Sequence, residues 1–488
     1  MSTPTTRRLA FAASAVSLAV LAGCATPGES TKRAELATPQ SVGAADGQAD
    51  WPAADWWHAY GDAELGKLID RALEQAPTVR IAEARLAQAT AQVQAAGGAL
   101  LPSLQVAASS TRERLSENYI YPAGLGGSTV NDNVLRLGGS WNLDLFGRDR
   151  AALDAAIGAR RAADADRAAA RWVLSTQIAR SWYQIARLVD LREVSASTLK
   201  QREQIRELVA DRVNVGLDTN VELRQAEGSV PQIRQDIEAI DEQIELARNG
   251  LAALVGVPPQ SLAEVAPRLP AKVSAQLPSV IPADLIGRRP DVVGARLRAE
   301  SALRGIDEAR AMFYPNINLT AFIGFHSIGL DRWVEAGSRE TGLTPAISLP
   351  LFDGGRLRAN LRAHEAGADA AIETYNQTLL SAVRDVADAV ASTRSVQRQI
   401  AEQQQAQAAA ESAYDLAVTR YQAGLGTYLT VLSAESNVLT QHRQAAELKA
   451  RTLDLQIALT RALGGGYRQP VEASANQHAA ASAASKAE

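Results

Sequence analysis

The sequence predicts a mainly α-helical protein with a small β part, and three observations support that prediction. Alanine is abundant, 21% of the residues are charged and only 5% are aromatic, a composition typical of long helices. Two segments of roughly 68 residues each keep apolar side chains at helical spacing from end to end. Four shorter segments alternate apolar and polar residues, as strands with one apolar face do.

The chain contains two copies of one unit of roughly 200 residues, which we place at 51–265 and 266–467. The segment 212–219 matches the segment 420–427 at an offset of 208 residues, with a glycine and a threonine in the same places. Prolines also match between the copies at a similar offset. Glycine and proline matches are not explained by two helices that happen to be rich in alanine. We therefore predict an internal duplication.

Each copy is expected to contain three helices, of which the second is very long and the third ends at a glycine. The predicted bounds are about 60–98, 147–214 and a last helix to Gly256 in the first copy, and about 282–312, 353–422 and a last helix to Gly464 in the second. At 1.5 Å per residue the long helices would extend roughly 100 Å. Helices of that length need other helices as partners.

Each copy also contains two predicted strands between its first and second helices. Their bounds are about 102–114, 132–146, 315–327 and 342–352. In the second of them, Leu135, Leu137 and Trp141 face one way, while Arg136 and Ser140 face the other. This pattern fits two settings, a soluble sheet over a core or a membrane barrel with lipid outside and a wet lumen.

The membrane setting has a structural consequence. Four strands do not close a barrel, because roughly eight are needed to enclose a filled interior, and open sheet edges are not tolerated in hydrocarbon. Several chains would have to contribute strands, and three chains would supply twelve. His326 lies on the polar face of the third strand, so we expect it in a barrel lumen rather than in a ligand site.

The first 23 residues are expected to be a signal peptide, with Arg7 and Arg8 ahead of a short apolar stretch. Leu21-Ala22-Gly23-Cys24 follows and resembles the bacterial lipobox. We therefore expect the Cys24 thiol to carry a covalent lipid, with acyl chains such as palmitate anchoring the protein. We expect a flexible tether at 24–50 and a disordered tail at 468–488. No later stretch is apolar and long enough for a transmembrane helix.

Composition argues against several other functions. The chain has 50 basic and 54 acidic residues and a net charge of -4, so no nucleic acid is expected as a partner. Its single cysteine forms no internal disulfide or metal cluster, and its five histidines show no ligand spacing. No nucleotide-binding or nucleophile motif is found. We expect no enzymatic activity, no catalytic residue, no metal and no cofactor beyond the lipid on Cys24.

Four motifs stand in order along the mature chain. They are Trp56-Trp57 followed by Tyr60, Asp62, Leu65, Leu68 and Ile69; segment 141–148 (Trp-Asn-Leu-Asp-Leu-Phe-Gly-Arg); segment 288–292 (Arg-Arg-Pro-Asp-Val); and segment 348–356 (Ser-Leu-Pro-Leu-Phe-Asp-Gly-Gly-Arg). Together they resemble, over about 51–467, the outer-membrane factor family of tripartite efflux systems (TolC-like channels), in its lipoprotein branch. The chain departs from that family at 76–78, where Asn-Pro-Asp is frequent, and at Asn142, where Glu is common.

The resemblance implies a homotrimer with a 12-stranded outer-membrane β-barrel on a 12-helix periplasmic α-barrel. It implies contact with outer-membrane lipid, with a periplasmic adaptor protein and, through the adaptor, with an inner-membrane pump. The location implied is the outer membrane of the cell, with a lipid anchor and helices extending into the periplasm. We expect a passive exit duct for small molecules such as drugs, with the energy supplied by the pump.

The two helix reversals are candidate sites. Each pairs a glycine suited to a helix C-cap with a threonine suited to capping the next helix. The resemblance implies that these turns form the periplasmic tips that contact the adaptor. The tip residues are Gly216, Leu217, Thr219, Gly424, Leu425 and Thr427.

Gate residues are implied by the resemblance near the start of the last helix. The matching positions are Leu429 and Ser433, and many relatives carry Asp at the second of them. Charges that could replace that Asp are Arg420, Asp218 and Glu222, with Glu435 as a further candidate. Each could equally be a solvated helix residue. Arg212 and Arg420 are candidates for ion pairs between neighbouring hairpins.

Two alternative functions remain open at this stage. A periplasmic structural or adaptor coiled-coil lipoprotein would share the long helices and the lipobox, but it needs no strands of membrane length. A secreted or surface enzyme with a helical stalk would need a catalytic cluster, and the sequence shows none.

Overall fold

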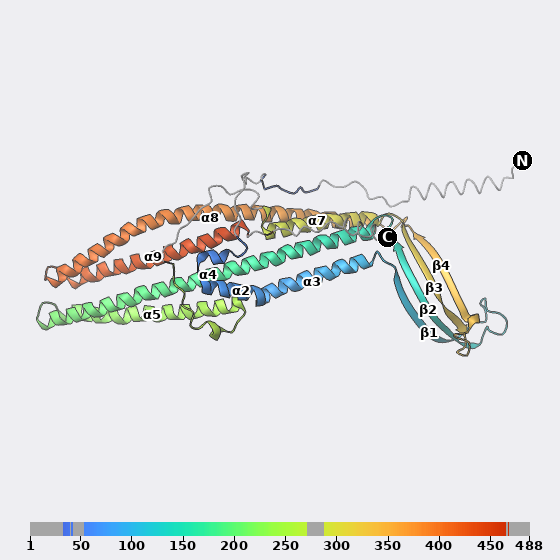
Figure 1. The fold of residues 1–488 in the computed structure, drawn as a ribbon, viewed down its shortest axis with the longest axis horizontal. Coiled ribbons are helices and arrows are strands. Elements are labelled where there is room, and N and C mark those ends of the chain that lie inside the picture. Colours follow the sequence, from blue (N-terminus) through green and yellow to red (C-terminus); the bar gives the residue numbers. More distant parts are fainter. Residues whose placement is uncertain (1–32, 40, 42–52, 271–286, 465–466, 468–488) are drawn as a thin grey trace, which may run out of the picture. The chain divides into compact units, whose positions relative to one another are not determined.

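The structure is a computed structural model that describes residues 33–39, 41, 53–270, 287–464 and 467 (Figure 1). The predicted signal peptide, Cys24 and the predicted tail lie outside the described residues. The chain divides into two compact units, and each takes segments from both copies of the duplication. The sheet unit comprises Arg85–Ala163, Ala295–Tyr375 and residues 33–36, and the hairpin unit comprises the other described residues.

The helices repeat between the two copies with equal lengths. Helices α4 (Arg148–Asn214) and α8 (Arg356–Gln422) both have 67 residues. Helices α5 (Asn220–Val255) and α9 (Tyr428–Leu463) both have 36 residues and end at glycines in the left-handed conformation, as expected for C-caps. None of the helices described is both long and apolar enough to cross a membrane.

The first helix of the first copy differs from the prediction. It is divided into α2 (Ala63–Gln75) and α3 (Pro77–Gly98), with Ala76 extended between them at ψ 136°. Proline disfavours the helical conformation of the residue before it and is well suited to begin a helix. In the second copy α7 (Pro290–Ala311) begins at the matching proline, and residues 282–286 lie outside the described residues.

The ends of each copy meet in the hairpin unit. Gly256, after α5, lies against Pro77, and a Cβ at Gly256 would be 3.1 Å from its Cδ. Gly464, after α9, lies against Arg289, the residue before Pro290, and a Cβ there would be 2.4 Å from its Cγ. Both glycines also have positive φ, so any larger residue would be disfavoured twice.

One antiparallel sheet contains the four strands β1 (Ser103–Arg114), β2 (Thr129–Leu143), β3 (Asn316–Ile328) and β4 (Arg339–Ser348), in that order. Leu137 of β2 lies opposite Val106 of β1 and Ile323 of β3. The predicted division into an apolar and a polar face is therefore confirmed. Strand β4 ends before Pro350, so Leu349 and Leu351 lie beyond it.

The apolar face of the sheet is not covered by other described parts of the chain. Large apolar side chains on that face keep much of their surface exposed, with Val106 70% exposed, Leu343 67% and Ile347 71%. Soluble proteins rarely leave an apolar surface of this extent open to water.

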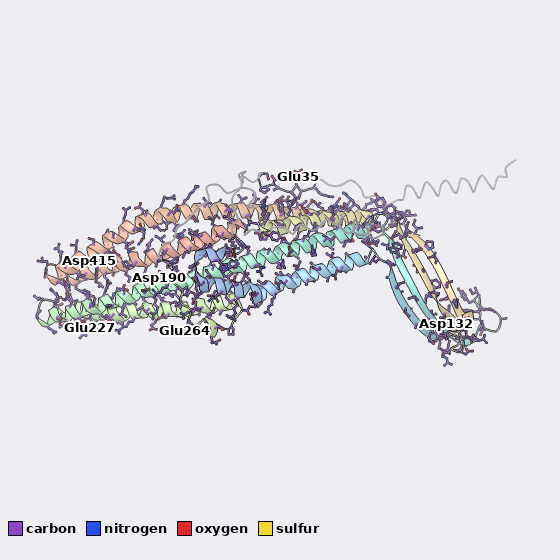
Figure 2. All side chains as sticks on the ribbon, in the orientation of Figure 1. Glu35, Asp132, Asp190, Glu227, Glu264 and Asp415 are labelled. Carbon is purple, nitrogen blue, oxygen red and sulfur yellow. The ribbon has the colours of Figure 1, made fainter. Side chains whose placement is uncertain are left out.

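The polar face of the sheet carries a charged network, which includes His326 as expected. Arg136 on β2 donates two hydrogen bonds to Glu340 on β4, at 2.9 and 2.5 Å. His326 lies 2.7 Å from Asp132 and 3.6 Å from Glu340. Figure 2 marks Asp132 on the sheet. Phe322 also lies on this face, with the Arg136 guanidinium 4.2 Å from its ring centre, an aromatic position that simple alternation does not predict.

The main core of the hairpin unit lies around α2 and the middle of α4. Trp56 and Trp57, in the short 3-10 helix Trp56–Tyr60, pack there with Trp182. Asp62 caps α2 by accepting from the amides of Glu64 and Leu65, and it also accepts from the Trp182 indole at 2.7 Å. The motif that begins with Trp56-Trp57 is therefore explained by packing in this core. Two further 3-10 helices are Pro259–Leu262 and Ala336–Ser338.

Part of the predicted tether is described and lies along α8. In the sheet unit, the Ala34 amide donates to Asp369 at 3.2 Å. In the hairpin unit, the Ala37 amide donates to Asn376 at 2.9 Å. These residues are held by hydrogen bonds to α8, whereas the sequence alone predicts a flexible segment there.

Candidate functional site at the two hairpin turns

The two helix reversals share one backbone geometry. Gly216 and Gly424 have φ values of 76° and 74°. After each glycine a leucine amide turns back to an arginine carbonyl, Leu217 to Arg212 and Leu425 to Arg420, both at 2.8 Å. These bonds satisfy carbonyls that the helix end would leave unpaired.

The threonines that follow the turns behave differently. Thr219 forms a capping box, because its hydroxyl accepts from the Val221 amide and the Glu222 carboxylate accepts from the Thr219 amide at 3.0 Å. The hydrogen bond from the Thr219 side chain lowers the pKa of Glu222, as do backbone N–H groups. The Glu222 carboxylate is thus used in capping α5. Thr427 makes no capping hydrogen bond with its side chain, and its hydroxyl lies 3.0 Å from that of Thr430, which stands where the first hairpin has Glu222.

Asp218 does not project freely into solvent, in contrast to the expectation that it could supply a gate charge. It forms an ion pair with Arg212 of its own hairpin at 2.9 Å and accepts a short hydrogen bond from the Tyr421 hydroxyl of the other hairpin. Arg212 also donates to the Tyr421 carbonyl at 3.0 Å, and its guanidinium lies 4.5 Å from the Tyr421 ring centre. We call these three residues the tip link.

The electrostatics of the tip link favour the ionised carboxylate. Burial opposes ionisation of Asp218, but hydrogen bonds from Arg212 and Tyr421 outweigh it and lower the pKa of this carboxyl. Burial and the hydrogen bond to Asp218 together raise the pKa of Tyr421. The link therefore holds one positive and one negative charge, with a neutral phenol between the hairpins.

A second connection between the hairpins lies further from the turns. Arg202 of α4 and Glu435 of α9 are only 9% and 3% exposed, and their side chains pair at 3.0 Å. Arg202 also donates to the Ser229 carbonyl of α5 at 2.9 Å. Burial raises the pKa of Glu435, and the ion pair with Arg202 counteracts part of that rise. Glu435 is therefore a buried structural residue, so it supplies no exposed charge to a gate.

Apolar packing supports these polar connections. Six buried side chains from four helices form a small core beside the turns, and they are Val209, Ala226, Ala417, Tyr421, Tyr428 and Val431. The two hairpins of the chain are thus joined near their turns by a core, an ion pair and the tip link.

The remaining predicted site residues are exposed. Leu217 and Leu425 are 64% and 70% exposed at equivalent places on the two turns. Leu429 and Ser433 are exposed on one face of α9. Arg420 is also exposed, and its guanidinium donates to the Leu425 carbonyl at 3.3 Å rather than to a carboxylate of another hairpin.

Sequence reasoning missed the roles of Arg202 and Tyr421. The repeat offset could have drawn attention to them, because their equivalents, Ala410 and Val213, cannot form the same contacts. Among the described residues, no group of three or more His, Cys, Asp or Glu side chains is placed to hold a metal ion.

Three features together define a class of outer-membrane channel proteins. They are long paired helices, one four-stranded sheet with an uncovered apolar face, and hairpins joined at their turns. The outer membrane protein VceC of Vibrio cholerae has this fold, with a TM-score of 0.81 and 37% identity over 86% of this chain and 100% of that one. The profile of the outer membrane efflux protein family matches residues 68–257 and 281–465. The chain belongs to this family.

Two curated relatives support the same conclusion. The multidrug resistance outer membrane protein MdtP of Shigella flexneri is 32% identical over 480 residues, which cover 93% of this chain and 95% of the relative. The fusaric acid resistance protein FusA of Burkholderia cepacia is 36% identical over 378 residues, 75% of this chain and 71% of the relative. The chain is an outer-membrane efflux channel, the exit duct of a tripartite efflux pump.

Proposed function

We propose that three copies of the chain form one passive duct that carries small organic molecules out of the cell. The observation that carries this proposal is the sheet, whose strands β1 and β4 are edges that do not pair with each other. Its apolar face is uncovered, as a lipid-facing surface would be. Three such sheets would supply twelve strands and could close on themselves without a free edge.

The test is the mass of the detergent-extracted protein, purified from the outer-membrane fraction and measured without heating by light scattering. A trimer in that fraction is the expected result. A water-soluble monomer would contradict the proposal, because the apolar sheet face would then have to be covered within one chain.

We propose that the two turns are the periplasmic tips and that they contact a periplasmic adaptor, which connects the duct to an inner-membrane pump. Leu217 and Leu425 support this, since they place two exposed leucines at equivalent points of the duplicated turn. Exposed apolar side chains in matching positions suit a partner that binds both hairpins in the same way. Replacing both leucines with Glu should abolish crosslinking to the adaptor while leaving the trimer intact.

We propose that Leu429 and Ser433 line the lumen near the tips, and that dilation of the tips opens the duct. Both residues are exposed on α9, beside a connection between hairpins that includes ionic and hydrogen-bonding contacts. Substituting Ser433 with Trp should reduce export without lowering the yield of trimer. Normal export by that variant would exclude a gate at this position.

We also propose that Cys24 carries the lipid anchor and that the chain itself catalyses no reaction. The lipobox-like segment before Cys24 supports the first proposal, and mass spectrometry of the mature N-terminal peptide tests it. The names of the relatives, which refer to multidrug and fusaric acid resistance, support small organic compounds as cargo. Accumulation of such compounds in a deletion strain would be the direct measurement.

A further inference from the structure

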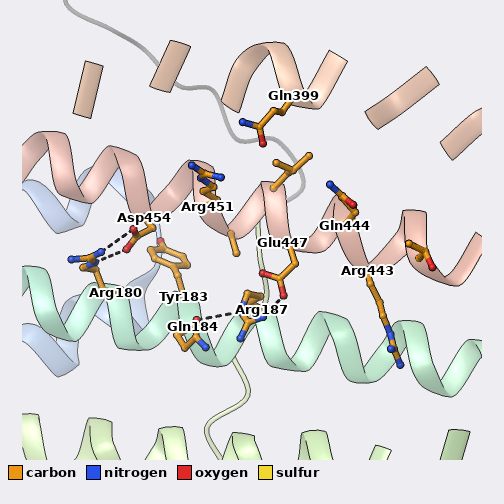
Figure 3. Close-up of a pocket in the computed structure, with 13 residues that line it drawn as sticks. Arg180, Tyr183, Gln184, Arg187, Gln399, Arg443, Gln444, Glu447, Arg451 and Asp454 are labelled. Atoms are coloured by element: carbon orange, nitrogen blue, oxygen red, sulfur yellow. Dashed lines mark hydrogen bonds and ion pairs between the residues drawn. The ribbon is translucent and has the colours of Figure 1, made fainter. Parts of the chain in front are cut away.

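A groove in the hairpin unit has a lining that differs in charge from the chain as a whole. It lies between α4 and α9, with Gln399 of α8 at its border, and has a volume of about 910 Å³ (Figure 3). Tyr183 and Leu448 lie in its lining and are almost fully buried, so they form an apolar floor. The charged residues in the lining are Arg180, Arg187, Arg443, Arg451, Glu447 and Asp454. Four positive and two negative side chains leave an excess of positive charge, although the whole chain has a net charge of -4.

The ion pairs of the groove show which arginines are available. Arg180 pairs with Asp454 and Arg187 with Glu447, so each of these two cations is balanced inside the groove (Figure 3). Arg451 stands on α9 between those two acids in the sequence, it is exposed, and it forms no ion pair with any residue the structure describes. Arg451 is therefore the guanidinium that is free to bind an incoming anion.

Arg443 adds to the positive character of the groove without a matching acid in its lining. Its guanidinium donates to Asp236 of α5 at 2.9 Å and to the Ser195 hydroxyl at 3.3 Å. Asp236 does not line the groove, so its negative charge lies to one side. Three of the four arginines in the lining are thus paired with acids, and Arg451 supplies the excess positive charge. Guanidinium groups bind carboxylates with two parallel hydrogen bonds.

The position of the groove on α9 connects it to the proposed duct. An exposed stripe runs along α9 in steps of three or four residues, through Leu429, Ser433, Ser436, Thr440, Gln444, Glu447 and Arg451. At 1.5 Å per residue, Arg451 lies roughly 33 Å along the helix from Leu429. The same face of α9 thus carries the residues assigned to the lumen near the tip and, further along, the groove.

We propose that this groove is a binding station in the duct wall for anionic cargo, specifically small aromatic carboxylates. The carboxylate would bind the Arg451 guanidinium, and the ring would rest on the apolar floor. This inference depends on the proposed function, since it needs the exposed stripe of α9 to face the lumen. Binding is weak enough for transit, because an exposed charge pair contributes only about 0.2–1 kcal/mol.

A binding experiment tests the chemistry directly on the full-length, detergent-solubilised trimer. The probes are salicylate and its neutral amide, salicylamide, which differ mainly in charge, and the method is equilibrium dialysis. We expect salicylate to bind and salicylamide to bind more weakly. The variant Arg451→Gln should weaken salicylate binding by about threefold to fivefold, the upper end of an exposed charge pair. The matched control is Arg394→Gln, an exposed arginine of α8 outside the groove, which should leave binding unchanged.

Three outcomes would overturn the proposal. Equal binding of salicylate and salicylamide would mean that charge is not recognised. If Arg451→Gln and Arg394→Gln weaken salicylate binding equally, the loss reflects the lower net charge of the protein and no specific contact with Arg451. Absence of salicylate binding to an intact trimer would mean that the groove is occupied, for example by a neighbouring copy of the chain.

An export assay separates this inference from the proposed function. If wild-type protein exports neither probe but still exports other drugs, the duct stands and the station for aromatic carboxylates is rejected. If it exports both, the variant Arg451→Gln should reduce salicylate export relative to salicylamide, and Arg394→Gln should not. An unchanged ratio in the Arg451 variant would reject the station while leaving the duct in place.

Discussion

The two hairpins of the chain have the same backbone but different side chains where they meet. Both have helices of 67 and 36 residues and a turn with a left-handed glycine. The first hairpin supplies the cations Arg202 and Arg212, and the second supplies their acceptors Glu435 and the Tyr421 carbonyl. Arg420 and Glu227 stand at the positions equivalent to Arg212 and Glu435, whereas Ala410 and Val213 stand at those equivalent to Arg202 and Tyr421. The two hairpins thus share a scaffold, and their connection includes side chains that only one of them has.

Glu435 and its equivalent Glu227 give the largest expected difference between the hairpins. Replacing Glu435 with Leu should leave Arg202 buried without a counter-ion and lower the free energy of unfolding of the tip region by about 3–5 kcal/mol. Glu227 pairs at the surface with Arg224, so Glu227→Leu should cost about 1 kcal/mol or less. Hydrogen exchange of amides near the turns measures both.

The double variant Arg202→Met with Glu435→Leu sharpens the same comparison. Replacing both buried charges with apolar side chains removes their desolvation penalty, so most of the lost stability should return. If the double variant is as unstable as Glu435→Leu alone, the pair has a role beyond satisfying its own charges.

Asp218 has no acidic equivalent in the second hairpin, where Gly426 stands instead. Asp218→Asn should weaken the tip link and destabilise the turns by about 2 kcal/mol, because Arg212 and Tyr421 lose a charged acceptor. The conductance of the purified channel in a planar bilayer should rise. The control Asp211→Asn, at an exposed position of α4, should leave the conductance at the wild-type level.

Acid should affect the two connections in a fixed order. The pKa of Glu435 is raised above 4.5, so the folded state takes up this proton first, and the contribution of this group to stability declines as pH rises through its folded pKa. The pKa of Asp218 is lowered below 3.8, so the stability it contributes is present above that value and is lost as pH falls through its folded pKa. Acidification should therefore open the Arg202 pair before the tip link.

Infrared titration of the carboxyl groups can follow this order. The band of the carboxyl group that is protonated at the higher pH should disappear in Glu435→Gln. The band of a carboxyl group protonated at the lower pH should disappear in Asp218→Asn. The reverse assignment would show that Asp218 is the more weakly held carboxylate.

The smallest expected effect compares the two threonine caps. Thr219→Ala removes a capping box and should destabilise α5 by about 1 kcal/mol. Thr427→Ala removes no capping hydrogen bond and should destabilise α9 by only about a few tenths of 1 kcal/mol. Equal losses measured by hydrogen exchange would mean that Thr427 caps its helix in solution.

Local patterns predicted much of the fold. Alternation placed Leu137 and Arg136 on opposite faces of β2, and the glycines at 216 and 424 marked the turns, because strand pleat and positive φ leave direct signatures in sequence. The break before Pro77 was missed, since apolar spacing continues across it. Helix bounds near the turns were accurate because glycine stops a helix sharply.

The candidate site was predicted less completely, for a physical reason. The location of the tips follows from local turn chemistry, but partners such as Arg202 and Glu435 are 233 positions apart. Periodicity gives the face of each residue on its own helix, without showing which helix lies opposite. Asp218 and Glu222 were therefore identified as notable charges, while their partners at the turns became visible only in the structure.

The contacts of Gly256 with Pro77 and of Gly464 with Arg289 bring the end of each copy back to its beginning. A segment whose two ends touch can be repeated in tandem without rearrangement, because each copy is closed by its own contacts. The same property would let two separate half-length chains take the place of one fused chain. The two glycines thus mark the points at which each half closes on itself.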